Sequence, residues 1–324
     1  MRALLFALFF SLSFAPAALA AEFYAVQPVT PGNTVVYPKR LRVLSEVLPS
    51  LQEKAESGDA EAQRNLGEKL LMLDKKAEAL KWLKKSAESG NADALYLLGY
   101  LALEDNRTDE SAKWFEKAAA NGNTQAFVSL GEMYLTNRRD PARAFPYFNR
   151  GAEAGNAHAQ YYLAICHSQG WGTKKDAKKG LEWLKKSAGN GFSEPMFMLF
   201  EIYSDPQPAK LCGVKTNPDK AVYWIERAAA ARAGSALFAI FNLAENGKGE
   251  IRPNAARGWI WTQWALDAVD NHDTENISHG KPELERKAAF FKEKMSDAER
   301  EETARIFKEW IENGYPVLSA TEPK

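Results

Sequence analysis

Residues 82–91 read WLKKSAESGN, and the same pattern returns at five later places along the chain. It appears as WFEKAAANGN at 114–123, YFNRGAEAGN at 147–156, WLKKSAGNG at 183–191, WIERAA at 224–229 and a degenerate WI at 259–260. The aromatic positions are 32, 33, 36, 41 and 35 residues apart. A period of this size is typical of proteins built from stacked helical repeats.

A second pattern pairs a small residue, or once a proline, with an apolar residue four positions later. The pairs are Ala62 and Leu66, Ala94 and Leu98, Ala126 and Leu130, Ala159 and Leu163, Pro195 and Leu199, and Ala236 and Ile240. This spacing places both members on one face of a helix. Gly67, Gly99 and Gly131 directly follow the leucine. Because a glycine inside a helix costs about 1 kcal/mol relative to alanine, its recurrence predicts a close approach of a neighbouring helix.

Each unit is therefore predicted to have a first helix with the small and apolar pair, a turn, and a second helix with the aromatic residue. The phase of the second helix predicts that its aromatic residue is buried, and these residues are Trp82, Trp114, Tyr147, Trp183 and Trp224. A unit this short cannot bury its apolar face alone, so stacking on its neighbours must supply the core. We predict an all-α fold, a right-handed α-solenoid of about six helix-turn-helix repeats with N- and C-terminal capping helices.

The repeated residues resemble the Sel-one-like repeat (SLR) family, which is related to the tetratricopeptide repeats. The resemblance covers roughly residues 51 to 312 and rests on the small residue, the Leu-Gly pair, a Gly-x-Gly turn at Gly170 to Gly172, and the Lys-Ala pair at Lys220. It extends to a closing helix from Met295 to Trp310. The later units depart from the family pattern at Pro195, Phe200, Arg232, Phe241 and the long connection 204–217, so we expect the fifth and sixth units to pack irregularly.

The ends of the chain differ from the repeats. Arg2, the apolar run 3–14 and the small residues before Ala21 predict a secretory signal peptide over 1–20, because the run is too short to span a bilayer. Prolines in 21–50 suggest an arm followed by a capping helix around 39–47. The repeat solenoid then spans 51–269, and 270–324 holds a polar loop and capping helices, with a Ser-x-x-Glu capping box at Ser296.

The composition excludes several classes of function. The 324 residues contain 42 Lys and Arg against 42 Asp and Glu, so the chain lacks the basic excess that nucleic acid or an anionic membrane favours. Its two cysteines, Cys166 and Cys212, leave two alternatives open, a disulfide between neighbouring repeats in an oxidising compartment or two separate buried thiols. The four histidines lack the i, i+4 spacing of a helical zinc site, so we expect no metal and no cofactor.

Catalytic motifs are also missing from the sequence. We find no nucleophile elbow, zinc-protease motif or phosphate-binding loop, and the one Ser-x-x-Lys tetrad, at 278–281, is expected in a loop. Some cysteine-rich members of the resembled family are associated with β-lactam binding or hydrolysis, but this chain lacks their regular cysteine pairs. We therefore predict that the protein is not an enzyme.

The remaining candidate for a functional site is a surface on the first helices of the repeats. In tetratricopeptide-like stacks these first helices line the concave side. We define the first-helix stripe as the residues three and six positions after each small residue: Asn65, Glu68, Leu97, Tyr100, Ser129, Glu132, Tyr162, Ile165, Met198, Glu201, Ala239 and Asn242. Aromatic, apolar and acidic side chains in one row suit a protein or peptide ligand. The alternative is that the apolar members pack between helices, because phase alone does not fix the rotation of a helix.

These observations predict a periplasmic adaptor or scaffold that binds another protein in its concave groove. The resemblance implies roles in envelope machinery, and a more specific version is an immunity protein that neutralises a secreted phospholipase-type toxin. The alternatives are an enzyme or binder acting on cell-wall or β-lactam compounds, and a carbohydrate-binding envelope protein if the tryptophans are exposed. We expect no nucleic-acid partner and no integral membrane segment after signal cleavage.

Overall fold

The computed structural model describes residues 48–136, 140–231, 234–270, 280–313 and 322–323. The predicted signal peptide and almost all of the predicted N-terminal arm lie outside these ranges, and residues 48–56 are helical. Within the described ranges no helix is both long and apolar enough to cross a membrane. The helices form two compact units, which divide inside α9 (Ala157–Gln169), and each is described separately below.

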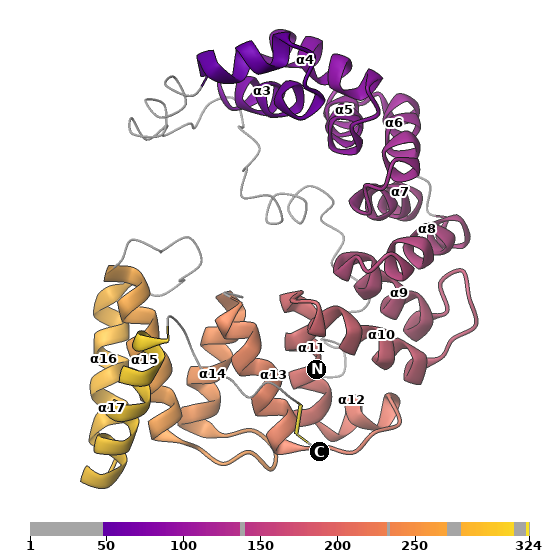
Figure 1. The fold of residues 1–324 in the computed structure, drawn as a ribbon. Coiled ribbons are helices and arrows are strands. Elements are labelled where there is room, and N and C mark those ends of the chain that lie inside the picture. The colour runs from indigo at the N-terminus through magenta and orange to yellow at the C-terminus, as the bar shows by residue number, and fades with distance from the viewer. Residues whose placement is uncertain (1–47, 137–139, 232–233, 271–279, 314–321, 324) are drawn as a thin grey trace. The chain divides into compact units, whose positions relative to one another are not determined.

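The first unit consists of helix pairs joined by short turns (Figure 1). In chain order these helices are α3 (Ala60–Met72), α4 (Lys76–Glu88), α5 (Ala92–Glu104), α6 (Thr108–Ala120), α7 (Gln125–Thr136) and α8 (Pro141–Glu153). Each pair is one predicted repeat, with the small and apolar residues on its first helix. The α-solenoid prediction is confirmed.

Glycines on the first helices let the second helices approach closely, as predicted. A Cβ atom added to Gly67 would lie 2.6 Å from Leu83 Cγ, and one added to Gly131 would lie 2.4 Å from Phe148 Cε1. At Gly99 the same atom would meet the Phe115 ring at 2.7 Å. Each of these distances is shorter than two carbon atoms tolerate, so a side chain at these positions would force the helices of one repeat apart.

In the first unit the same contacts correct the prediction that the repeated aromatic residue is the buried one, whereas in the second unit Trp183 is half-buried and Trp224, 4% exposed, is buried as predicted. In the first unit the fully buried side chain is the next residue, because Leu83, Phe115 and Phe148 are each 0% exposed. Trp82, Trp114 and Tyr147 are only half-buried and lie at the edge of the core. Consecutive residues are separated by about 100° of rotation around a helix. The residue after the repeated aromatic therefore points at the glycine of the first helix, and the aromatic residue itself does not.

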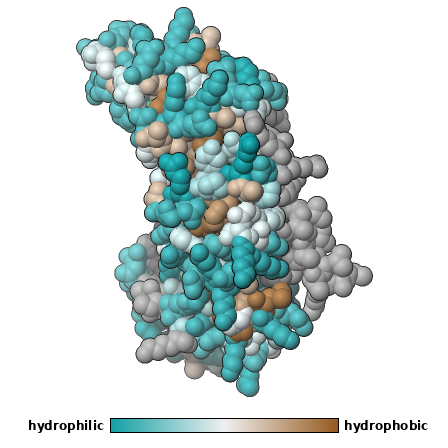
Figure 2. Space-filling view, turned by 90° about the vertical axis from the view of Figure 1, so that its right-hand side faces the viewer, coloured by the Kyte–Doolittle hydropathy of each residue, from teal (hydrophilic) through white to brown (hydrophobic). Residues whose placement is uncertain are grey.

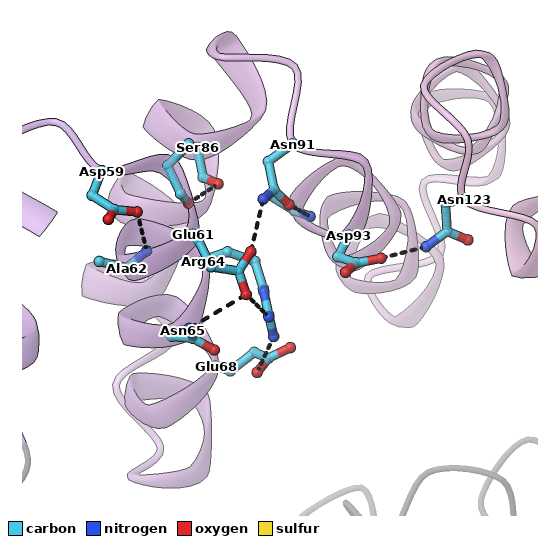
Figure 3. A network of polar contacts seen from close by, with 12 residues as sticks. Asp59, Glu61, Ala62, Arg64, Asn65, Glu68, Ser86, Asn91, Asp93 and Asn123 are labelled. Carbon is cyan, nitrogen blue, oxygen red and sulfur yellow. Dashed lines mark hydrogen bonds and ion pairs between the residues drawn. The ribbon is translucent and has the colours of Figure 1, made fainter.

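Asparagines join consecutive repeats of the first unit. The N–H of Ala94 donates to Asn91 Oδ1 (2.9 Å) at the start of α5, while Asn91 Nδ2 donates to Glu61 of the preceding repeat (3.2 Å) (Figure 3). Asn123 accepts from the N–H of Ala126 (3.0 Å). It donates to Asp93 (2.8 Å), as Figure 3 shows. One side chain thus caps its own helix and binds the previous first helix, which fixes the register between repeats.

We expect Asn123→Ala to lower the free energy of unfolding by about 1–2 kcal/mol, because it removes a helix cap and a hydrogen bond to a charged partner. Urea unfolding followed by circular dichroism measures this change. Asn121→Ala is the matched control, since its exposed amide donates only within its own turn, to the Lys117 carbonyl, and the cost there should stay below about 0.5 kcal/mol. Equal losses in the two variants would contradict the role assigned to Asn123.

The second unit has larger side chains and longer connections than the first. Its helices after α9 are α10 (Ala177–Gly189), α11 (Ser193–Ser204), α12 (Pro206–Leu211), α13 (Pro218–Ala230), α14 (Gly234–Asn246), α15 (Ala255–Asp270), α16 (Lys281–Glu293) and α17 (Asp297–Glu312). Phe200 and Phe241, which replace the first-helix glycine, are buried in its core. The additional helix α12 occupies the long connection that the sequence identified, so the fifth unit is irregular as expected.

The second unit also contains a close approach of two helices, and it tests the expectations about Ser296 and Lys281. The two helices of the fourth repeat, α9 and α10, also approach each other closely, but here the glycine is Gly180 on the second helix. A Cβ atom added to Gly180 would lie 3.0 Å from the Ala164 carbonyl oxygen on α9. Ser296 and Glu299 form the predicted capping box at the start of α17, and Trp310 packs on Trp261 with ring centres 5.3 Å apart. Lys281, expected in a loop, instead begins α16, while Ser278 and His279 lie outside the described residues.

Candidate protein-binding surface

The first-helix stripe lies at the border between core and solvent in both units. In the first unit every stripe residue is half-buried: Asn65, Glu68, Leu97, Tyr100, Ser129 and Glu132. In the second unit Asn242 is exposed and the others are half-buried: Tyr162, Ile165, Met198, Glu201 and Ala239. The leucine or isoleucine beside each stripe position is buried, from Leu66 to Ile240. These side chains therefore pack on the core along one edge and present the other edge to solvent.

Charged and amide groups form a connected network at the start of the stripe (Figure 3). Arg64 makes ion pairs with Glu61 and, at 2.8 Å, with Glu68 on the same helix. Asn65 donates to Glu61 at 3.5 Å, and Asn91 reaches the other oxygen of that carboxylate from the next repeat. Sequence reasoning identified Asn65 and Glu68 but not Arg64, whose i, i+4 spacing from Glu68 was a signal for the ion pair.

Tyr100 is the aromatic member of the stripe in the first unit. Burial raises the pKa of its hydroxyl, and the charge of Glu104 raises that pKa further. Burial likewise raises the pKa of Glu104, while Lys76 opposes the shift. The hydroxyl of Tyr100 stays protonated at neutral pH and can donate a hydrogen bond to a ligand. Its ring packs partly on the core around Phe115, so the side chain is held in one place.

The second unit places apolar and charged stripe residues side by side. The Tyr162 ring lies 5.7 Å from that of Tyr161, and Met198 packs partly against the core. Glu201 forms an ion pair with Lys248, with 2.7 Å between Oε1 and Nζ, so the lysine compensates the negative charge of this carboxylate. Sequence reasoning missed Phe238 on α14, which is 56% exposed and lies one position before Ala239 of the stripe. An aromatic ring exposed beside the stripe extends the apolar area that a partner could cover.

The repeated tryptophans carry lysines on their exposed faces. Lys85 Nζ lies 4.4 Å from the Trp82 ring centre, Lys117 Nζ 4.8 Å from that of Trp114, and Lys186 Nζ 4.0 Å from that of Trp183. Such cation–π contacts use the ring face on which a sugar would stack. The face shown in Figure 2 is mainly hydrophilic, with small separate hydrophobic areas.

The histidines and acids do not gather into a metal site in the part of the chain that the structure describes. His158 and His167 lie on α9, and burial lowers the pKa of each, to about 4 for His158. Both are therefore neutral at pH 7. His272 and His279 lie outside the described residues.

The two cysteines are free thiols in the structure. Cys166 is 0% exposed on α9, and Cys212 is half-buried at the end of α12. Burial raises the pKa of Cys166 to about 12 and raises that of Cys212 as well. Only the thiolate form of a cysteine reacts readily with disulfide reagents and oxidants. Cys166 should therefore resist such reactions, because its side chain is inaccessible to solvent and its raised pKa keeps the thiol protonated.

We expect one thiol per folded chain, that of Cys212, to react with an aromatic disulfide reagent at pH 8, and two after denaturation. With a pKa of about 12, roughly one Cys166 in ten thousand is ionised at that pH. Stopped-flow absorbance counts the thiols, and Cys212→Ser should remove the fast phase. Finding no thiols in denatured, unreduced protein would instead demonstrate a disulfide.

Comparison with known sequences identifies the repeats. A model of the Sel1 repeat matches residues 60–91, 92–123, 128–156, 157–192, 196–232 and 237–268, which together make up more than half of the chain. The chain belongs to the Sel1 repeat family. The family resemblance drawn from the sequence is confirmed, and its six repeats correspond to six matched segments.

Solved structures of other Sel1 repeat proteins are similar to this one. A Sel1 repeat protein of Oxalobacter formigenes is 34% identical, with a TM-score of 0.50, over 55% of this chain and 74% of the other. A protective antigen of uropathogenic Escherichia coli with an SLR fold is 24% identical, with a TM-score of 0.53, over 75% of this chain and 56% of the other. The second likeness supports the Sel1 fold.

A curated protein is also similar to part of this chain. Chitin synthase regulatory factor 3 of Schizosaccharomyces pombe is 32% identical over 108 residues, which are 33% of this chain and 11% of that protein. The chain thus spans about a tenth of the length of this curated relative.

Proposed function

We propose that the protein is a periplasmic adaptor or scaffold of the bacterial envelope that binds another protein along its first-helix stripe. The observation that supports this most is that each unit has half-exposed aromatic and apolar side chains on its first helices, Leu97 and Tyr100 in the first unit and Tyr162 and Met198 in the second. Aromatic and apolar side chains that are already held by the core lose little entropy when a partner covers them. The 34% identity to a bacterial Sel1 repeat protein supports the bacterial assignment.

Export is part of the proposal and has its own test. We expect the protein recovered from a periplasmic extract to begin at Ala21, because Ala18 and Ala20 stand where a signal peptidase requires small residues. Intact mass measurement of that protein gives its N-terminus. Recovery from the cytoplasm with residues 1–20 still attached would contradict the periplasmic location.

The binding surface is tested with two stripe variants. We expect Tyr100→Ala and Tyr162→Ala each to weaken partner affinity about 10- to 100-fold, as removal of a central aromatic anchor does at many interfaces. The partner is first captured with the tagged mature chain from the envelope fraction, then purified, and affinities are measured by calorimetry. Lys81→Ala and Lys113→Ala, on exposed positions of second helices, are the controls and should bind as the unaltered chain does.

The more specific proposal is that the partner is a toxic phospholipase-type enzyme and the chain is its immunity protein. If so, the captured protein hydrolyses phospholipid vesicles alone, and a stoichiometric amount of the chain stops this reaction. A captured protein without such activity would leave the scaffold proposal standing and reject the immunity role. Loss of binding in the second-helix controls, with the tyrosine variants unaffected, would reject the first-helix stripe itself.

A further inference from the structure

A glutamate near the C-terminus lies on the second unit, far along the chain from the residues that it contacts. Glu322 Oε2 is 3.3 Å from Lys185 Nζ, and the Trp224 indole N–H donates to Glu322 Oε1 at 3.2 Å. Tyr203 of α11 interacts electrostatically with both Lys185 and Glu322. Both oxygens of one carboxylate are engaged, by groups from α10 and α13. The tail segment is the short yellow piece beside α13 in Figure 1.

The groups that hold this carboxylate belong to the rigid part of the second unit. Trp224 is 4% exposed and Tyr203 is 3% exposed, and both pack in the core cluster that joins α11 to α13. Lys185 is partly covered, with a side chain 34% exposed, and its ammonium lies 5.4 Å from the Tyr203 ring centre. The ammonium of Lys220 approaches the same ring to 5.5 Å. These donors are positioned by the helix packing, because two of the three side chains are buried in it.

The chemistry of the site selects an anion with two oxygens. A lysine supplies a full positive charge, the indole N–H can only donate, and burial raises the pKa of Tyr203 so that its hydroxyl keeps a proton to donate. Burial alone would lower the pKa of Lys185, but the Tyr203 hydroxyl and the Glu322 carboxylate raise it above its ordinary value. Hydrogen bonds between charged partners are about twice as strong as neutral ones, which favours a carboxylate over an amide.

We propose that Lys185, Tyr203 and Trp224 form a recognition site for a glutamate side chain in an extended peptide of a partner protein, and that Glu322 occupies this site in the free chain as a tethered competitor. The site uses none of the first-helix stripe residues, so it does not depend on the function proposed above. Tethering gives Glu322 a high effective concentration, and a partner peptide binds once it displaces the tail.

Occupation by the tail is tested by NMR of the full mature chain with ¹⁵N-labelled tryptophan indoles. The Trp224 signal is assigned with Trp224→Phe, which keeps an aromatic ring and removes the donor. We expect Glu322→Gln to move the Trp224 signal more than that of any other tryptophan. Glu312→Gln, on an exposed carboxylate of α17, is the matched control and should leave it in place. An unmoved Trp224 signal in Glu322→Gln would overturn the proposed occupancy.

Recognition of a separate peptide is tested with the chain's own tail sequence, VLSATEPK, carrying an N-terminal fluorophore. Fluorescence anisotropy should show that the peptide binds the full-length Glu322→Gln chain about tenfold or more tightly than the unaltered chain, because the tethered competitor is weakened. Adding Lys185→Met to that variant, or replacing the peptide glutamate by glutamine, should abolish binding. Equal affinity for both chains, no binding to either, or full binding by the Lys185→Met variant would each overturn the proposal.

Discussion

Phe115→Ala should lower the free energy of unfolding by about 3–5 kcal/mol, whereas Trp114→Ala should lower it by about 1–2 kcal/mol. Phe115 is 0% exposed and fills the space beside Gly99, so its removal leaves a cavity between the two helices of one repeat. Trp114 is the larger residue, but it is half-buried, and its ring carries Lys117 on one face. The smaller aromatic residue is thus the more important one for stability.

Urea unfolding of both variants, followed by far-UV circular dichroism, provides the comparison. A stack of repeats can unfold in more than one step, so the first transition and the calorimetric enthalpy should be recorded together. A larger loss in Trp114→Ala than in Phe115→Ala would show that the second helix is rotated by about one residue relative to this structure.

Gly131→Ala should destabilise the chain by about 2 kcal/mol, although alanine favours a helix by about 1 kcal/mol over glycine. The added Cβ would lie 2.4 Å from Phe148 Cε1 and 2.6 Å from Cζ, and Phe148 is fully buried and cannot turn away. Gly189→Ala is the matched control, because nothing lies within 4 Å of a Cβ added there. That change should instead stabilise the chain by up to about 1 kcal/mol.

A double-mutant cycle tests whether the loss at Gly131 arises from Phe148. In a Phe148→Leu background the smaller side chain leaves room, so Gly131→Ala should cost at least 1 kcal/mol less than in the unaltered chain. Thermal and urea unfolding of the four proteins give the coupling. Additive losses, or a destabilising Gly189→Ala, would argue against a steric origin.

The sequence was sufficient for the repeat architecture because the pair of a small residue, or once a proline, and an apolar residue recurs six times, and three of the copies also carry a glycine after it. Gly67, Gly99 and Gly131 appear at one register, and only close helix packing explains a residue that helices otherwise avoid. The burial of Trp114 was predicted wrongly because the two adjacent large residues, Trp114 and Phe115, fit the helical period equally well. Periodicity locates an apolar face to within about one residue, and only the structure shows which residue opposes the glycine.

The candidate surface was predictable in part, since the stripe residues follow from the same periodicity. Their half-exposed state depends on how far each helix rotates toward its neighbours, which the pattern does not determine. Contacts made outside the repeat pattern could not be anticipated. Lys248 meets Glu201 across 47 residues of sequence, and Trp224 meets Glu322 across 98. Neither contact follows from the residues that recur in the repeats, so the sequence pattern did not point to it.

The asparagines that bind each repeat to the one before it also bear on how such a chain can change in length. Asn91 and Asn123 each need one acceptor, Glu61 and Asp93, at the same position of the preceding unit. A duplicated unit would bring its own asparagine and its own acceptor, and would therefore fit between existing neighbours without any compensating substitution. Gene duplication in steps of one repeat can lengthen or shorten this protein, whereas an insertion of a few residues inside a helix would break the match on both sides.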